Sequence, residues 1–305
     1  MPRRRAPVPE LRRALSHHEA LDLGISRGRL ASPALQHPFW GVVRERRLNV
    51  DEAEFAQRCH DYAARMPRHQ FFSHGTALRL HGAPVPFGVA EQLHVATHRP
   101  AREPRTRGIT GHRLQARDDA AGVVDGLRVE HPVRAWRQAG ASWGALALTQ
   151  AGDFLLARRR PLATIEELRA EVATMGGTPA LRRALTQVRV GSESPRETEL
   201  RLILVAAGLP EPELNVDIRV GGATASGRFV ARLDLFYRRY GVAVEYDGRQ
   251  HAADARQFAR DADRWDAIRD ADVTLVRILD HHLADGGRAA VAKVRAALRR
   301  RGYPR

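Results

Sequence analysis

Cysteine and lysine are nearly absent from this chain of 305 residues, which has one cysteine, Cys59, and one lysine, Lys293. A single cysteine excludes an internal disulfide and a cysteine-rich zinc site, and it fits a reducing, cytoplasmic setting. No apolar run approaches the roughly 20 residues that span a bilayer. The basic start, Met1–Arg5, has no apolar segment after it, so we expect neither a secretory signal nor a membrane partner.

Acidic residues are too few to balance the basic ones, since 50 Lys and Arg stand against 35 Asp and Glu, a net charge of +15. Such an excess favours a polyanionic partner, most simply DNA or RNA. A GC-rich coding bias is an alternative source of the many arginines. That bias explains arginine in place of lysine but not the excess of basic over acidic residues, so we expect DNA as the partner. Oligomeric state is open, with a homodimer among the alternatives.

The length and the changes of pattern predict a multidomain α+β and α/β protein. We expect a helix-turn-helix-like domain over 1–60, a mixed region with a helical linker over 61–190, and a further α/β domain over 191–305. The segment Gly191–Pro195 is the best boundary signal, because small and turn-forming residues interrupt two helical patterns there.

Near the N-terminus, Ser16 and Ser26 are placed to cap two short helices, and the second helix carries Arg27 and Arg29. A strand-like stretch follows over 38–44. Helix, tight turn, basic helix and strand is the order of a winged helix-turn-helix, in which Arg27 and Arg29 would contact DNA. Any small helical hairpin has the same order and is an equal alternative from pattern alone.

The rest of the chain alternates helices and strands. In the middle region the pattern predicts helices over 51–64, from 72 and between 143 and 190, with strands over 92–97 and 127–130. After the boundary the expected order is helix, three strands, helix, strand and helix, over 196–207, 214–220, 229–237, 242–247, 254–270, 273–278 and 288–301.

Two of these strands read as a hairpin whose loop ends in Gly241, the residue that tolerates positive φ. Counting back from this loop places Asp234 opposite Glu245 on one face of the sheet. Asp247 points the same way, because side chains alternate along a strand. The other face is expected to carry apolar residues that suit a core, namely Leu233, Leu235, Val244 and Tyr246.

Three carboxylates on one face repel one another unless a cation intervenes, and oxygen ligands suit Mg²⁺ or Mn²⁺. The hairpin therefore predicts a metal site at Asp234 and Glu245, to which Glu197 could add an oxygen. Arg201, one helical turn after Glu197, could pair with it or with a phosphate. His251 could act as general base. The simpler alternatives are edge-strand acids that meet arginines and a polar loop histidine.

The segment 229–278 resembles the PD-(D/E)xK nuclease superfamily, and more closely the very-short-patch-repair endonuclease-like family called DUF559. Seven pieces carry the resemblance over about 192–300: 194–197, 208–210, 232–234, 244–248, His251, Asp261 with Arg264, and 275–277. The resemblance implies a restriction-endonuclease-like domain with a four-stranded mixed sheet and Mg²⁺-dependent hydrolysis of DNA phosphodiesters. It also implies Asp234 and Glu245 as metal ligands.

One position departs from the superfamily pattern, because Asp247 stands where a lysine is usual. The family it resembles shares this form, so we count Asp247 and His251 with the catalytic residues. His251, Arg264 or a second metal ion could take over the lysine's role. Arg201, Arg249 and Arg264 are expected to contact DNA, with an ion pair to Asp261 as the alternative for Arg264.

The N-terminal half more weakly resembles AbiEi-type antitoxins of type IV toxin–antitoxin systems, over residues 10–150. The segments 21–30, 38–43 and 72–77 carry this resemblance, which implies a DNA-binding winged helix-turn-helix and a further antitoxin-like domain. Two functions follow. The first is a Mg²⁺- or Mn²⁺-dependent DNA endonuclease, and the alternative is a DNA-binding regulator with a non-cleaving nuclease fold and a toxin partner.

Overall fold

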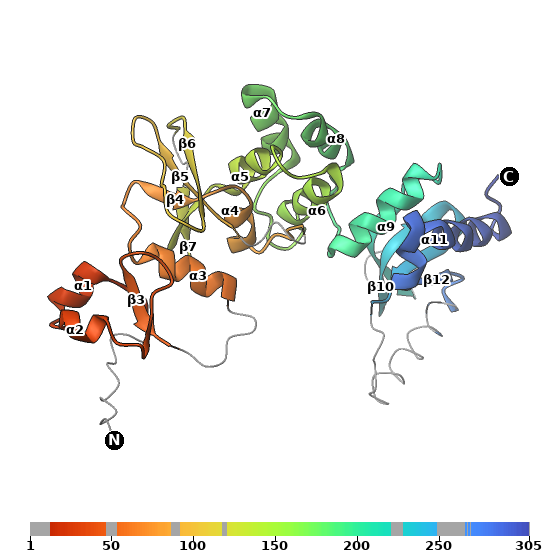
Figure 1. The fold of residues 1–305 in the computed structure, drawn as a ribbon. Helices are drawn as coiled ribbons and strands as arrows, with labels where there is room; N and C mark the ends of the chain where they lie inside the picture. Colours follow the sequence, from red (N-terminus) through yellow and green to blue (C-terminus); the bar gives the residue numbers. More distant parts are fainter. Residues whose placement is uncertain are drawn as a thin grey trace, which may run out of the picture. The chain divides into compact units, whose positions relative to one another are not determined.

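The computed structural model describes residues 13–46, 54–86, 92–117, 121–220, 228–248, 266, 268 and 270–304. The chain folds as two compact units, Met1–Trp143 and Gly144–Arg305 (Figure 1). The helices between 144 and 190 thus belong with the C-terminal unit, whereas the sequence placed them in a middle region. The described part is a mixed α/β protein, as the pattern predicted, and it contains three sheets.

The first unit begins with two short helices, α1 (His17–Asp22) and α2 (Arg27–Leu30). Both predicted caps are present, because the hydroxyl groups of Ser16 and Ser26 accept hydrogen bonds from the Glu19 and Arg29 amides at 3.1 and 3.4 Å. A small sheet in the order β1-β3-β2 accompanies these helices, with strands β1 (Leu15–Ser16), β2 (Leu35–Gln36) and β3 (Val42–Glu45).

A five-stranded sheet in the order β6-β5-β4-β8-β7 forms the rest of the first unit. Its strands are β4 (Gln70–Phe72), β5 (Leu93–His98), β6 (Ile109–Leu114), β7 (Ala121–Val124) and β8 (Leu127–Glu130), and its helices are α3 (Glu54–Ala63), α4 (His74–Leu80) and α5 (Pro132–Ala139). Only β5, β8, α3 and α4 were predicted. Strands β5 and β6 run parallel, an arrangement that needs a connection leaving and re-entering the sheet.

Three helices open the second unit: α6 (Ala145–Leu155), α7 (Ile165–Met175) and α8 (Pro179–Gln187). The predicted capping box at Thr164 is present, since Thr164 and Glu167 exchange backbone-to-side-chain hydrogen bonds at 2.7 and 3.2 Å. Thr178 caps α8, with proline at the first helical position.

The C-terminal sheet has four strands in the order β12-β11-β10-β9, with β11 and β12 parallel and the other pairs antiparallel. The predicted four-stranded mixed sheet is therefore confirmed. Its elements are α9 (Pro195–Ala206), β9 (Glu213–Val220), β10 (Arg228–Tyr237), β11 (Val242–Tyr246), β12 (Thr274–Ile278) and α11 (Asp280–Arg300). Helix α11 is interrupted at residues 284–287, so its regular part begins near the predicted start.

Helices α9 and α11 cover one face of this sheet and share an apolar core with it, which includes Leu235 and Val244. A second cluster on the sheet contains Leu233, so the prediction that Leu233 and Leu235 lie together is wrong. The strands are irregular here: Asn215, which lies between the partners of Leu233 and Leu235, has φ +47°. Among the described helices, none has the length and hydropathy to cross a bilayer.

Candidate functional site

Strands β10 and β11 pair in the register that the sequence predicted. Tyr237 opposes Val242 across the turn, and Gly241 closes the turn in the left-handed conformation with φ 59° and ψ 37°. The paired residues end at Leu235 opposite Val244, and Asp234 and Glu245 are the next residues of the two strands. These two acids therefore come from the two central strands of the sheet.

The carboxylate of Asp234 reaches across to β11, where its Oδ2 accepts a hydrogen bond from the Tyr246 amide at 3.0 Å. Glu245 is 8% exposed. Because strand side chains alternate, Glu245 lies on the same face as Ala243, away from the core that α9 and α11 cover. This acidic pair (Asp234 and Glu245) is a candidate cation site, because two neighbouring carboxylates offer the oxygen ligands that Mg²⁺ prefers.

A guanidinium lies close to the acidic pair. Arg277 of β12 is the register partner of Glu245, and its Nη2 donates a hydrogen bond to Asp247 Oδ2. The Asp247 amide donates to the carbonyl of Ile278 at 2.8 Å, which holds the end of β11 against β12. Arg277 thus places a positive charge beside Asp247. This contact was not predicted from the sequence.

Glu197 has internal partners. Its Oε2 accepts hydrogen bonds from Asn215 Nδ2 at 2.8 Å and from the Glu193 amide at 3.0 Å. The Glu197 amide in turn donates to Ser194 Oγ at 3.1 Å, so Ser194 caps α9. The side chain therefore ties the start of α9 to β9 at the irregular position Asn215.

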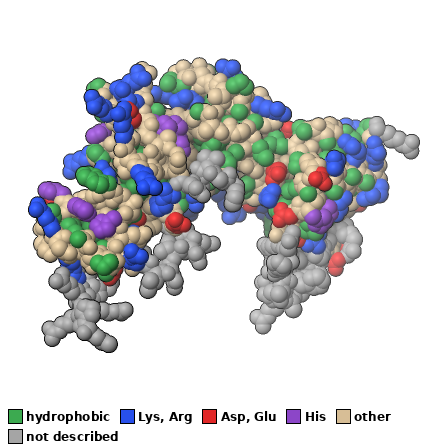
Figure 2. All heavy atoms as spheres, in the orientation of Figure 1, with side chains coloured by type: hydrophobic (Ala, Val, Ile, Leu, Met, Phe, Trp, Pro, Cys, Tyr) green, Lys and Arg blue, Asp and Glu red, His purple; other side chains and the backbone are tan. Residues whose placement is uncertain are grey.

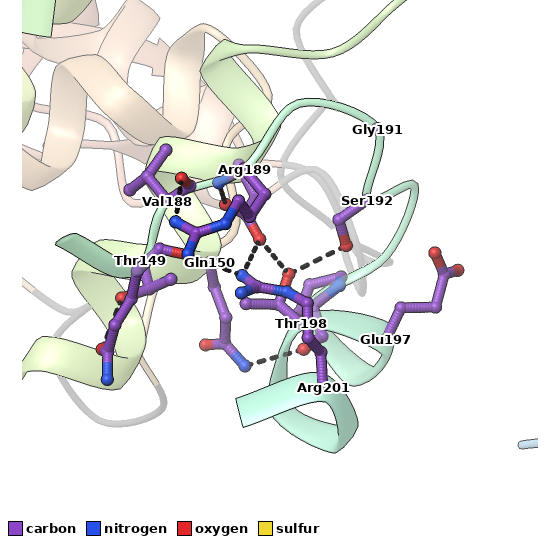
Figure 3. Close-up of polar contacts among 12 residues, drawn as sticks. Thr149, Gln150, Val188, Arg189, Gly191, Ser192, Glu197, Thr198 and Arg201 are labelled. Carbon is purple, nitrogen blue, oxygen red and sulfur yellow. Dashed lines mark hydrogen bonds and ion pairs between the residues drawn. The ribbon is translucent and has the colours of Figure 1, made fainter. Parts of the chain in front are cut away.

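Arg201 is buried in a polar network, where its side chain is 1% exposed (Figure 3). It donates to Asp153 Oδ2 of α6 at 3.0 Å and to Glu211 Oε1 at 3.0 Å, while Glu197 points away from it. Thr198 Oγ1 also donates to Asp153, at 2.8 Å. Arg201 joins α6 to α9 from the interior, a position that differs from the DNA contact expected of it.

The predicted acids do not gather as a set of three. Among the described residues, one group of three His, Cys, Asp or Glu side chains could hold a metal ion. It consists of His74, His94 and His112, whose ligand atoms lie within 4.8 Å of one another. The structure therefore leaves the acidic pair, rather than a group of three or four carboxylates, on the C-terminal sheet. The physical reason is that Glu197 and Asp247 are held by Asn215 and Arg277.

The histidine cluster, formed by His74, His94 and His112, was not predicted from the sequence. The three residues are separated by about 20 positions each, with none of the short ligand spacings that mark a metal motif. The only signal is the alternation around His94, where Leu93 and Val95 are buried and the histidine faces the other way. The pairing of β5 with β6 brings His112 into place, and this pairing could not be read from local pattern.

A groove of about 1140 Å³ lies beside the N-terminal helices, and its lining includes Trp40, Arg58, Arg65 and Arg107. Trp40 is 84% exposed, and the Arg65 guanidinium lies 5.4 Å from its ring centre. Arg27 is exposed on α2, and Arg29 is half-buried. Figure 2 shows Lys and Arg side chains on both units, with fewer acidic side chains on the same face.

Some predicted site residues lie outside the described residues, namely Arg249, His251 and Arg264. Asp261, the alternative ion-pair partner of Arg264, and most of the expected helix over 254–270 also lie outside them.

No family model matches this chain. Two curated proteins are similar to it, an uncharacterized protein of Mycobacterium tuberculosis strain CDC 1551 / Oshkosh and one of strain ATCC 25618 / H37Rv. Each is 30% identical over 133 residues, which are 44% of this chain and 47% of the relative. The chain thus spans about half the length of the curated relatives that it matches.

Proposed function

We propose that this protein is a Mg²⁺- or Mn²⁺-dependent DNA endonuclease. The observation that carries the proposal is the acidic pair, two carboxylates on neighbouring central strands, one of them nearly buried, in a chain of net charge +15. Mg²⁺ is commonly held by one or two carboxylates together with waters and substrate phosphates. Asp234 and Glu245 therefore fit this ion without a further protein ligand.

The chemistry follows from the charges around the pair. A bound ion would polarise the phosphodiester and lower the pKa of an attacking water. Asp234 and Glu245 would hold the ion, and Asp234 is oriented for this by the Tyr246 amide. Arg277 would add positive charge beside the phosphate, the role of the missing lysine. Asp247 would then position Arg277 instead of acting as a ligand.

DNA would be held mainly by the first unit. We propose that α1, α2 and the strands beside them act as a winged helix-turn-helix with Arg27 and Arg29 at its surface. The groove beside them supports this role, since it combines arginines with the exposed ring of Trp40, and aromatic faces stack on bases. The attraction to phosphates would weaken steeply with salt.

Cleavage of plasmid and single-stranded DNA in Mg²⁺ or Mn²⁺ tests the proposal. The wild-type chain should cut, and Asp234→Asn and Glu245→Gln should each lower the rate by at least a hundredfold, since removing one charge-stabilising group costs about 10²–10³ in rate. Asp217→Asn is a matched control, because Asp217 is an exposed acid of the same sheet whose partner is Arg232. Equal inactivity of wild type and variants on every substrate would reject the endonuclease.

An antitoxin-like transcriptional regulator with a degenerate nuclease fold is the second candidate. The observation that favours it is that Glu197 and Asp247, two of the expected acids, are engaged by Asn215 and Arg277. Such a protein would protect its own promoter in a footprint, with or without a divalent ion, and would cut nothing. A toxin partner belongs to this candidate alone.

A further inference from the structure

The start of α4 is fixed against β5 by two hydrogen bonds. The Ser73 amide donates to the carbonyl of His94 at 3.0 Å, and the His94 amide donates to Thr76 Oγ1 at 2.8 Å. These bonds hold the first turn of α4 beside the middle of the five-stranded sheet. His74, the first residue of α4, is thereby placed next to His94.

His112 reaches the same place from β6. In the parallel pair of β5 and β6, Ala96 is the register partner of His112, so His94 and His112 are diagonal neighbours on one face of the sheet. His94 Nδ1 and His112 Nε2 are 2.9 Å apart, and the rings of His74 and His112 are stacked with centres 3.7 Å apart. Three imidazoles from three elements thus converge.

His74 is held in an unusual conformation for this role. Its φ is +52°, a region that residues other than glycine and asparagine adopt at a cost. Its amide donates to Glu130 Oε2 at 3.2 Å, and its Nδ1 lies 3.1 Å from Ser73 Oγ. The contact with Ser73 engages one ring nitrogen, as a hydrogen bond does in metal-binding histidines, and Nε2 would then be the ligand atom.

We infer that His74, His94 and His112 bind a borderline divalent ion, with Zn²⁺ as the expected occupant. Imidazole nitrogens suit Zn²⁺, Ni²⁺ and Cu²⁺, whereas Mg²⁺ prefers oxygen. In a tetrahedral site with Zn–N distances of about 2.0–2.1 Å, the nitrogens are about 3.4 Å apart. The three ligand atoms lie within 4.8 Å of one another, so binding would need them to move closer together.

All three residues are half-buried, so a water can complete the coordination as the fourth ligand.

Zinc titration of the full chain by calorimetry tests the inference. Wild type should bind one Zn²⁺ at the cluster, and His94→Gln and His112→Gln should each weaken that binding at least tenfold. His74→Asn is a further variant, chosen because asparagine tolerates positive φ and keeps the helix start intact. Ser73→Ala should weaken binding by about 10–100-fold, the usual effect of losing a partner of a ligating histidine.

His98→Gln is the matched control, because His98 lies on the same strand but outside the cluster, with its ring against Phe71. It should bind Zn²⁺ as wild type does. Co²⁺ replacement supplies a second readout, since a tetrahedral site gives visible absorption that the cluster variants should lose. The inference would be overturned if wild type bound no Zn²⁺. It would also be overturned if the cluster variants that still melt cooperatively bound Zn²⁺ as tightly as wild type. Neither result depends on DNA cleavage.

Discussion

Replacing Arg201 by methionine tests whether the polar network between α6 and α9 is a structural element of the second unit. The guanidinium and the carboxylate of Asp153 are each 1% exposed, and they meet at 3.0 Å. Arg201 also donates to the carbonyl of Gln187 at 2.9 Å. Methionine keeps much of the apolar volume of the stem, so the substitution mainly removes the charge.

The expected loss of stability is large, because Asp153 would be left as a buried charge with only neutral donors. Removing one partner of a buried ion pair typically costs about 3–5 kcal/mol. For a domain of 150–250 residues, 1 kcal/mol corresponds to about 2–4 °C in Tm, so the melting temperature of the second unit should fall by about 6–20 °C. An exposed pair would cost at most about 1 kcal/mol.

The loss should depend on pH. Burial raises the pKa of Asp153, and Arg201 opposes this rise. A carboxyl whose pKa is raised by folding contributes stability that is present below its unfolded pKa and is lost as the pH rises through its folded pKa. Without Arg201 the folded pKa rises further. Arg201→Met should therefore lose less stability near pH 4, close to the unfolded pKa of about 3.9, than at pH 7.

Urea unfolding followed by circular dichroism at both pH values measures this difference. Arg196→Met is the control, since Arg196 lies on the same helix with its side chain 50% exposed, and it should change stability by about 0.5 kcal/mol or less. If Arg201→Met were no more destabilised than Arg196→Met at pH 7, the reasoning about this network would be refuted. A loss of DNA binding without a loss of stability would instead support the role first predicted for Arg201.

Three further predictions concern other parts of the chain. Gly111→Ala should destabilise the first unit by about 1–3 kcal/mol in thermal melts, because the added Cβ would clash with the backbone oxygen of Pro104. An unchanged Tm would contradict this. A hydrogen bond from Arg232 lowers the pKa of Asp217, so the pair stabilises the fold above the unfolded-state pKa of Asp217, and this stabilisation is lost as the pH falls through the folded-state pKa. Arg232→Gln should therefore make the loss of stability with falling pH less steep. Identical acid unfolding curves for wild type and variant would refute the effect. Trp40→Ala should leave Tm unchanged, because the ring is exposed, and it should weaken single-stranded DNA binding by about 1–3 kcal/mol in fluorescence titrations. Unaltered affinity would show that Trp40 does not contact DNA.

Local features of the fold could be predicted from the sequence. Ser16, Ser26 and Thr164 cap helices as expected, because a capping bond forms within four residues and depends only on neighbours. The turn at Gly241 and the register of the hairpin it closes were predicted for the same reason. These features depend on contacts between positions close in the chain.

Features that depend on distant partners could not be predicted. Arg201 reads as a surface residue of a helix, but its partner Asp153 is 48 positions earlier, in α6. His112 reaches His94 only through the parallel pairing of β5 and β6. The number of acids at the candidate site also depends on such contacts, because Arg277 and Asn215 engage Asp247 and Glu197 from other strands.

The central claim, that the acidic pair holds a divalent ion, is tested most directly by Mn²⁺ titration of the full chain. One Mn²⁺ should bind to the wild-type chain. This binding should be lost in Asp234→Asn and in Glu245→Gln, and it should be kept in Asp217→Asn and in His112→Gln. The last variant separates this site from the histidine cluster. Absence of Mn²⁺ binding, or binding that survives both changes to the acidic pair, would contradict the claim.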